Sequence, residues 1–125
     1  MRDRMESDDL KEIRDLFEQA EREEDLDVKL AALRDAISTF ASFTADSSSD
    51  AGDVAIAKNL HDTYLRRITK QITSAKKMNS STFYGYLSLL LFKPNFHTKQ
   101  LLSNDPDMSD AYAKLWERYQ GFVRL

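Results

Sequence analysis

The two histidines of the chain, His61 and His97, are its first candidates for acid–base or metal chemistry. A helical metal site usually places a second histidine or a glutamate three or four residues from the first. In the segment KNLHDTY and the residues beside it, no histidine or glutamate lies three or four residues from His61. Asp62 follows His61 directly, but consecutive helical positions point about 100° apart, so adjacency alone predicts no orienting pair. We therefore expect both histidines to be surface or boundary residues without a role in catalysis.

The segment DSSSDAGD has the polar composition of a calcium-binding loop. Asp46, Ser48 and Asp50 stand at the first, third and fifth ligand positions of such a loop. However, Ala51 takes the place of the glycine that makes the sharp turn, and Ala57 takes the place of the bidentate glutamate. The pattern therefore predicts a linker without a metal ion. Because the chain also lacks a nucleophile elbow and a glycine-rich phosphate loop, we expect a non-catalytic protein with no cofactor.

Length and composition limit the fold class. A chain of 125 residues can bury the core of one domain, and 42% hydrophobic with 31% charged residues is typical of globular proteins. Three glycines and two prolines favour long helices over many short strands. The absence of cysteine excludes disulfides and fits a reducing compartment. Since no apolar run near the amino terminus marks a signal peptide, we expect a cytoplasmic protein.

Hydrophobic periodicity predicts four amphipathic helices, over residues 8–24, 26–44, 54–77 and 108–123. Each helix repeats apolar residues at spacings of three and four. The predicted core stripes are Leu10, Ile13, Phe17 and Ala20, then Leu26, Leu30, Leu33, Ile37 and Phe40, then Ala57, Leu60, Tyr64, Ile68, Ile72 and Ala75, and last Met108, Tyr112, Leu115, Tyr119 and Phe122. Asp53 and Asp107 stand where cap residues are expected.

The most apolar segment is SSTFYGYLSLLLFKPNF. Its uncharged part, Phe83 to Phe92, is roughly half as long as a membrane span requires, so we expect no membrane span. Ser80 or Ser81 can cap a helix, and Pro94 ends one soon afterwards. A strand rich in aromatic residues is the alternative, but no other segment offers a pairing strand. We predict a buried helix over residues 81–92.

Between the last two predicted helices we expect an irregular connection with a short turn of helix at residues 98–102. The predicted fold class is therefore all-α, a bundle of about five helices that forms a single domain over residues 1–125. Within it, residues 8–77 form a three-helix core, and residues 78–125 add aromatic-rich helices.

Charge is distributed unevenly. Residues 1–53 hold sixteen acidic and seven basic residues, a net charge of −9, whereas residues 54–100 hold eight basic and one acidic, a net charge of +7. The basic residues of the third predicted helix share one face: Lys58, Arg66, Arg67, Lys70, Lys76 and Lys77. This basic face is either solvated and partly neutralised by the acidic helices, or a binding face for phosphates, anionic lipid or an acidic peptide. Binding of nucleic acid is the weaker version of this reading, because the sequence pI is near 5.4 and the third predicted helix lacks interleaved exposed aromatics for base stacking.

The segments LAALRDAISTF and YLRRITKQI resemble the second and third helices of microtubule-interacting-and-trafficking domains. The residues that match the pattern of that family's third helix are Tyr64, Leu65, Arg67 and Ile68. The resemblance covers residues 8–77 and leaves the carboxy-terminal third without a counterpart. It implies a three-helix hairpin that docks a short partner helix in a groove between two of its helices and has no enzymatic activity.

Nine of the thirteen aromatic residues follow residue 82. These rings either pack in the core or form an interface, since tyrosine and tryptophan are favoured interface anchors. The candidate interface residues are Tyr86, Leu89 and Trp116. A symmetric dimer is the commonest way to cover an apolar patch. We expect a protein–protein interaction or adaptor module with a homodimer as its form; the alternative is a regulatory protein that binds nucleic acid or anionic lipid through the basic face.

Overall fold

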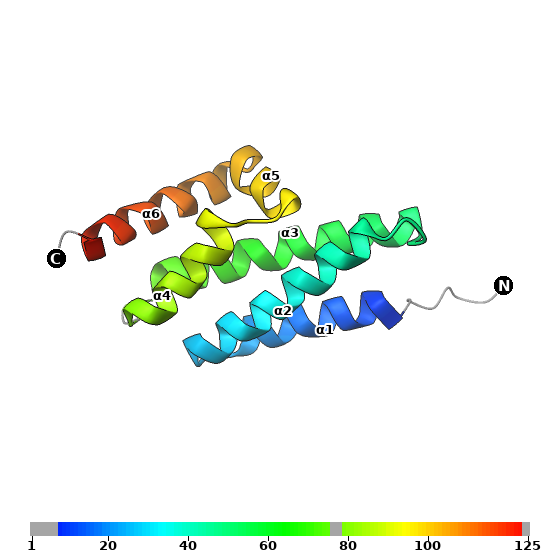
Figure 1. Ribbon diagram of the computed structural model, residues 1–125, viewed down its shortest axis with the longest axis horizontal. Coiled ribbons are helices and arrows are strands. Elements are labelled where there is room, and N and C mark those ends of the chain that lie inside the picture. Colours follow the sequence, from blue (N-terminus) through cyan, green and yellow to red (C-terminus); the bar gives the residue numbers. More distant parts are fainter. Residues whose placement is uncertain (1–7, 76–78, 124–125) are drawn as a thin grey trace.

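The computed structural model describes residues 8–75 and 79–123, which are almost entirely helical (Figure 1). The all-α prediction is confirmed, because neither of these two ranges contains a strand. Residues 8–75 and 79–123 form six helices where about five were predicted. They are α1 (Asp8–Arg22), α2 (Leu26–Ala45), α3 (Ala51–Ser74), α4 (Ser80–Leu87), α5 (Phe96–Asn104) and α6 (Pro106–Val123), with a π-helical turn η1 (Ser88–Phe92) that continues α4.

The first three helices pack against one another around a common core. The predicted stripe of α1 is confirmed, since all four of its residues are buried. In α3 the prediction is only partly right, because Tyr64 is half-buried while its neighbour Leu65 is fully buried. The reason is that α3 contacts α1 and α2 and also α5 and α6, so its buried face is wider than one stripe.

Side-chain oxygens fix where the helices begin. The carboxylate of Asp25 accepts hydrogen bonds from the Asp27 and Val28 N–H groups at the start of α2, which have no acceptor within the helix. The predicted caps of α3 and α6 are wrong by a few residues. Asp50 caps α3 by accepting from the Asp53 N–H at 3.1 Å, and Asp105 accepts from the Met108 N–H at 3.2 Å at the start of α6.

The helix predicted over residues 81–92 is confirmed as a helix, although its cap is Asn79, which accepts from the Thr82 N–H at 2.7 Å. It crosses α2 at Gly85, where an added Cβ would overlap Leu30. Its last turn widens into the π-helical η1, in which the Lys93 N–H donates to the Ser88 carbonyl at 2.8 Å.

The connection predicted after this helix is only partly right. The short turn of helix expected at residues 98–102 is present, but it belongs to a longer helix, α5, over Phe96–Asn104. Asn95 caps α5 by accepting from the Thr98 N–H at 2.8 Å. The chain then turns into α6, which packs on α5 and α3 and extends to the same end of the molecule as α4 (Figure 1).

Candidate functional site

His61 lies in the core, and the prediction that it is a surface or boundary residue is wrong. It is fully buried and stacks on Phe40 with ring centroids 4.5 Å apart. Its Nδ1 lies 2.8 Å from Asp62 Oδ1, so the expectation that these neighbours form no orienting pair is also wrong. The Cβ atoms of His61 and Asp62 do point in different directions. The contact forms because the short side chain of Asp62 turns back toward Nδ1, which is the nitrogen of the His61 ring nearer to the backbone.

The other ring nitrogen of His61, Nε2, lies 3.0 Å from Thr98 Oγ1. The chain Asp62–His61–Thr98 therefore has the connectivity of an activated nucleophile with its base and orienting acid. Both His61 and Thr98 are fully buried, so no substrate reaches the threonine hydroxyl in this conformation. The chain of contacts joins α5 to α3, and its role in the structure is to position α5.

Thr98→Val keeps the side-chain shape but leaves His61 Nε2 without its partner in the core. We expect the free energy of unfolding to fall by about 1–3 kcal/mol, the cost of a buried polar group left unpaired. Urea unfolding followed by circular dichroism measures it. The matched control is Thr63→Val on the partly exposed side of α3, where we expect a change within about 0.5 kcal/mol. Equal effects of the two substitutions would contradict a structural role for this contact.

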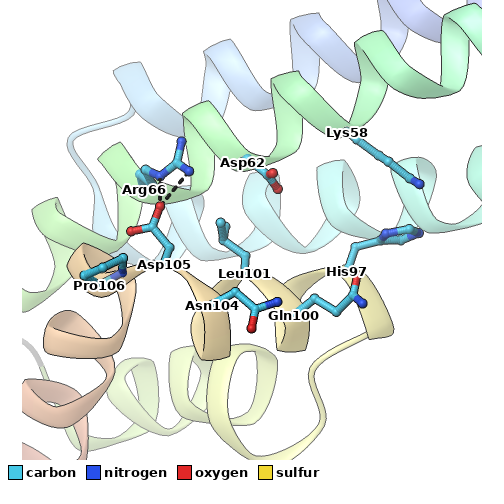
Figure 2. Close-up of a pocket in the computed structure, with 9 residues that line it drawn as sticks. All are labelled: Lys58, Asp62, Arg66, His97, Gln100, Leu101, Asn104, Asp105 and Pro106. Carbon is cyan, nitrogen blue, oxygen red and sulfur yellow. Dashed lines mark hydrogen bonds and ion pairs between the residues drawn. The ribbon is translucent and has the colours of Figure 1, made fainter.

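A polar cavity of about 360 Å³ lies between α3 and α5 (Figure 2). Its lining residues are Lys58, Asp62, Arg66, His97, Gln100, Leu101, Asn104, Asp105 and Pro106. At one end, Arg66 Nε and an Arg66 terminal nitrogen lie 2.7 and 2.6 Å from the same oxygen of Asp105. Desolvation raises the pKa of Asp105, but hydrogen bonds from Arg66 and the Met108 N–H outweigh it and lower that pKa overall.

The cavity has little preference for a charged ligand. Desolvation lowers the pKa of His97 below its usual range, and the electrostatic effects of Lys58 and His61 lower this pKa further, whereas Asp62 opposes them. The two cations and two carboxylates in the lining balance each other. In the part of the chain that the structure describes, no group of three or more His, Asp or Glu side chains could hold a metal ion.

Ion pairs neutralise much of the basic face. Lys58, Arg67 and Lys70 are exposed and Arg66 is partly exposed, whereas Lys76 and Lys77 lie outside the described residues. The acidic partners come from α1, from α6 and from the residue that joins α5 to α6. The pairs are Arg66 with Asp105, Arg67 with Glu21 at 3.5 Å, and Lys70 with Asp107 at 3.8 Å. The four basic side chains that the structure describes are therefore interleaved with carboxylates, and by themselves they form no continuous cationic surface.

Four aromatic rings meet at the surface where α4, η1 and α6 converge. We call Tyr84, Phe92, Trp116 and Tyr119 the aromatic surface. Trp116 stacks on Tyr119 with centroids 5.3 Å apart, Phe92 meets Tyr119 edge-on at 5.6 Å, and Tyr84 does so at 5.9 Å. Tyr84, Phe92 and Trp116 are 50%, 42% and 43% exposed, so these three residues of the aromatic surface are open to water, whereas Tyr119 is partly buried.

The π-helical turn explains how Phe92 joins the aromatic surface. In a continuous α-helix, Phe92 would lie about 80° around the axis from Tyr84, because the two are eight residues apart. A π turn rotates less per residue, and it brings Phe92 back to the side of Tyr84, with centroids 6.4 Å apart. Such turns are frequent at functional sites.

Arg118 positions α6 for these contacts. Its guanidinium donates to the Ala75 carbonyl at 2.7 Å, at the end of α3, and lies 5.5 Å from the centroid of the Phe83 ring. The ion pair between Arg66 and Asp105 holds the start of α6 in the same way. The aromatic surface is thus anchored to α3 at both ends of α6.

The three predicted interface residues differ in their burial. Tyr86 is fully buried and its hydroxyl donates to the Leu26 carbonyl at 2.8 Å, so it is no surface anchor in this structure. The reason is that α4 packs on α2 and turns Tyr86 toward it. Leu89 is partly buried against the core, and Trp116 is exposed. The sequence analysis missed Tyr84 and Phe92 as surface residues.

Comparisons with family models, curated proteins and solved structures find no match to this chain, so the resemblance to microtubule-interacting-and-trafficking domains stays a prediction. Within the described ranges, none of the helices is both long and apolar enough to cross a membrane.

Proposed function

We propose that the protein is a non-catalytic interaction module that binds a short apolar segment of another protein through the aromatic surface. The observation that carries this proposal is the contact of four rings at the surface, three of them about half exposed. A contiguous exposed apolar patch is typical of an interaction site, and tyrosine and tryptophan are the residues most often found at binding hot spots.

The size of the aromatic surface favours a short segment over a second copy of the chain. Three half-exposed rings offer roughly 300 Å². A stable interface between two folded proteins removes about 800 Å² from each partner. A helix in a groove binds through a few anchoring side chains, which is a closer fit to the area offered. We therefore favour a partner segment over the homodimer expected from the sequence.

The basic face has less support as a binding surface for nucleic acid or anionic lipid. Three of its four described cations lie within 4 Å of a carboxylate from outside α3. Exposed pairs of this kind contribute little to stability, but they reduce the local positive potential on which phosphate binding depends.

The proposal is tested by selecting random peptides displayed on phage against the wild-type protein. Peptides that are enriched on the wild type should bind the double variant Tyr84→Ser, Phe92→Ser at least about tenfold more weakly, because the anchoring rings are gone. Both positions are half exposed, so circular dichroism should show a folded protein.

The control variant is Phe96→Ser. Phe96 is 66% exposed and contacts His97 outside the aromatic surface, so its loss should leave peptide affinity unchanged. Equal binding of the enriched peptides to the wild type and the double variant would overturn the proposal, as would a selection that enriches nothing.

A further inference from the structure

A cleft of about 340 Å³ continues the aromatic surface along α6. It is lined by Pro94, Lys99, Leu102, Ser103, Ser109 and Tyr112. Pro94 lies two residues beyond Phe92, and Tyr112 lies one helical turn before Trp116. The cleft and the aromatic surface can therefore be covered by one extended or helical segment.

The interior of the cleft is suited to an apolar side chain. Leu102 is buried, and Tyr112 is 38% exposed at the rim. The Ser109 hydroxyl donates to the Leu102 carbonyl at 2.9 Å, so its donor is already used within the protein. The volume is at the lower end for ligand pockets and admits one large aliphatic or aromatic side chain.

One lysine lines this cleft, and a second precedes the lining residue Pro94 in the chain. Of the described residues that line it, Lys99 alone carries a charge. Lys93, which is exposed, lies between Phe92 and Pro94. Neither lysine forms an ion pair with another described residue, in contrast to Lys114, which pairs with Asp110 at 3.3 Å.

We infer that the partner segment is acidic as well as apolar. A large apolar side chain of the segment fills the cleft, its neighbouring apolar side chains cover the aromatic surface, and its Asp or Glu residues pair with Lys93 and Lys99. Opposite charge at the edge of an apolar contact selects the partner and its register. This inference rests on the proposed function, and it adds the chemical class of the partner.

The test measures the affinity of a synthetic copy of the most enriched phage peptide. Replacing its Asp and Glu residues by Asn and Gln, or making the double variant Lys93→Gln, Lys99→Gln, should weaken binding at least about tenfold and flatten its salt dependence. Lys114→Gln is the control, because Lys114 is exposed on α6 but paired, and it should leave the affinity unchanged.

The outcomes separate this inference from the proposed function. Enriched peptides that need Tyr84 and Phe92 but lack acidic residues, or that bind the two-lysine variant as tightly, overturn the acidic partner and leave the aromatic surface as a binding site. Enriched peptides that do not need Tyr84 and Phe92 overturn both. Vesicles of phosphatidylserine and phosphatidylcholine provide a further arm: binding to them that requires Lys93 and Lys99 would assign these two lysines to a membrane and overturn the peptide assignment.

Discussion

Lys29→Met is expected to lower the free energy of unfolding by about 3 kcal/mol. Lys29 is buried in α2, and its ammonium group donates to the Ala20, Glu21 and Glu23 carbonyls at 2.6, 3.0 and 3.0 Å. These are among the last carbonyls of α1 and the turn after it, which have no partner within the helix. Methionine keeps the apolar stem and removes all three donors, so the carbonyls lose partners that water can replace only in part.

Urea unfolding measures this change, and Lys11→Met is the matched control. Lys11 is exposed on α1, so its substitution should change stability by no more than about 0.5 kcal/mol. Desolvation lowers the pKa of Lys29, while the charges of Glu21 and Glu23 oppose it. If Lys29→Met is as stable as the wild type, these hydrogen bonds do not hold α1 against α2.

Leu33→Asp is expected to abolish cooperative folding. Leu33 is fully buried in the core of α1, α2 and α3. An ionised carboxylate at this position loses its hydration, which lowers the free energy of unfolding by several kcal/mol. This cost is comparable to the whole free energy of unfolding of a small domain, about 5–15 kcal/mol. Thermal unfolding followed by circular dichroism at 222 nm should show little helix and no transition for this variant.

Val28→Asp on the same helix is the control for Leu33→Asp. Val28 is 44% exposed, so a carboxylate there stays hydrated and should leave the melting temperature nearly unchanged. An unfolding transition of Leu33→Asp at the wild-type temperature would show that the buried face of α2 has been misassigned.

The first three helices were predictable because their apolar residues repeat at helical spacing and face one core. The same reasoning predicted only a short turn of helix at residues 98–102 in place of α5, because the buried apolar side chains of this helix are only Leu101 and Leu102. Its position depends on the contact of Thr98 with His61, which lies 37 residues earlier in the chain. The spacing of apolar residues within a helix cannot reveal a contact between residues so far apart in the sequence.

The aromatic surface was predicted only through Trp116. A single apolar helix has no polar face in its sequence to show which side is outward, so Tyr86 was placed outside and Tyr84 was missed. The packing of α4 on α2 at Gly85 decides this orientation. Phe92 depends in addition on the π-helical turn, which changes the angular spacing that sequence periodicity assumes.

Acrylamide quenching of Trp116 fluorescence tests most directly whether the aromatic surface is open in the free protein and covered by a partner segment. Trp116 is the single tryptophan of the chain, so its emission reports this surface alone. We expect strong quenching that is independent of protein concentration in the free protein, and a blue shift with protection from acrylamide when the enriched peptide is bound. Protection that grows with protein concentration would indicate a dimer, and quenching unchanged by a saturating peptide would contradict the proposed binding site.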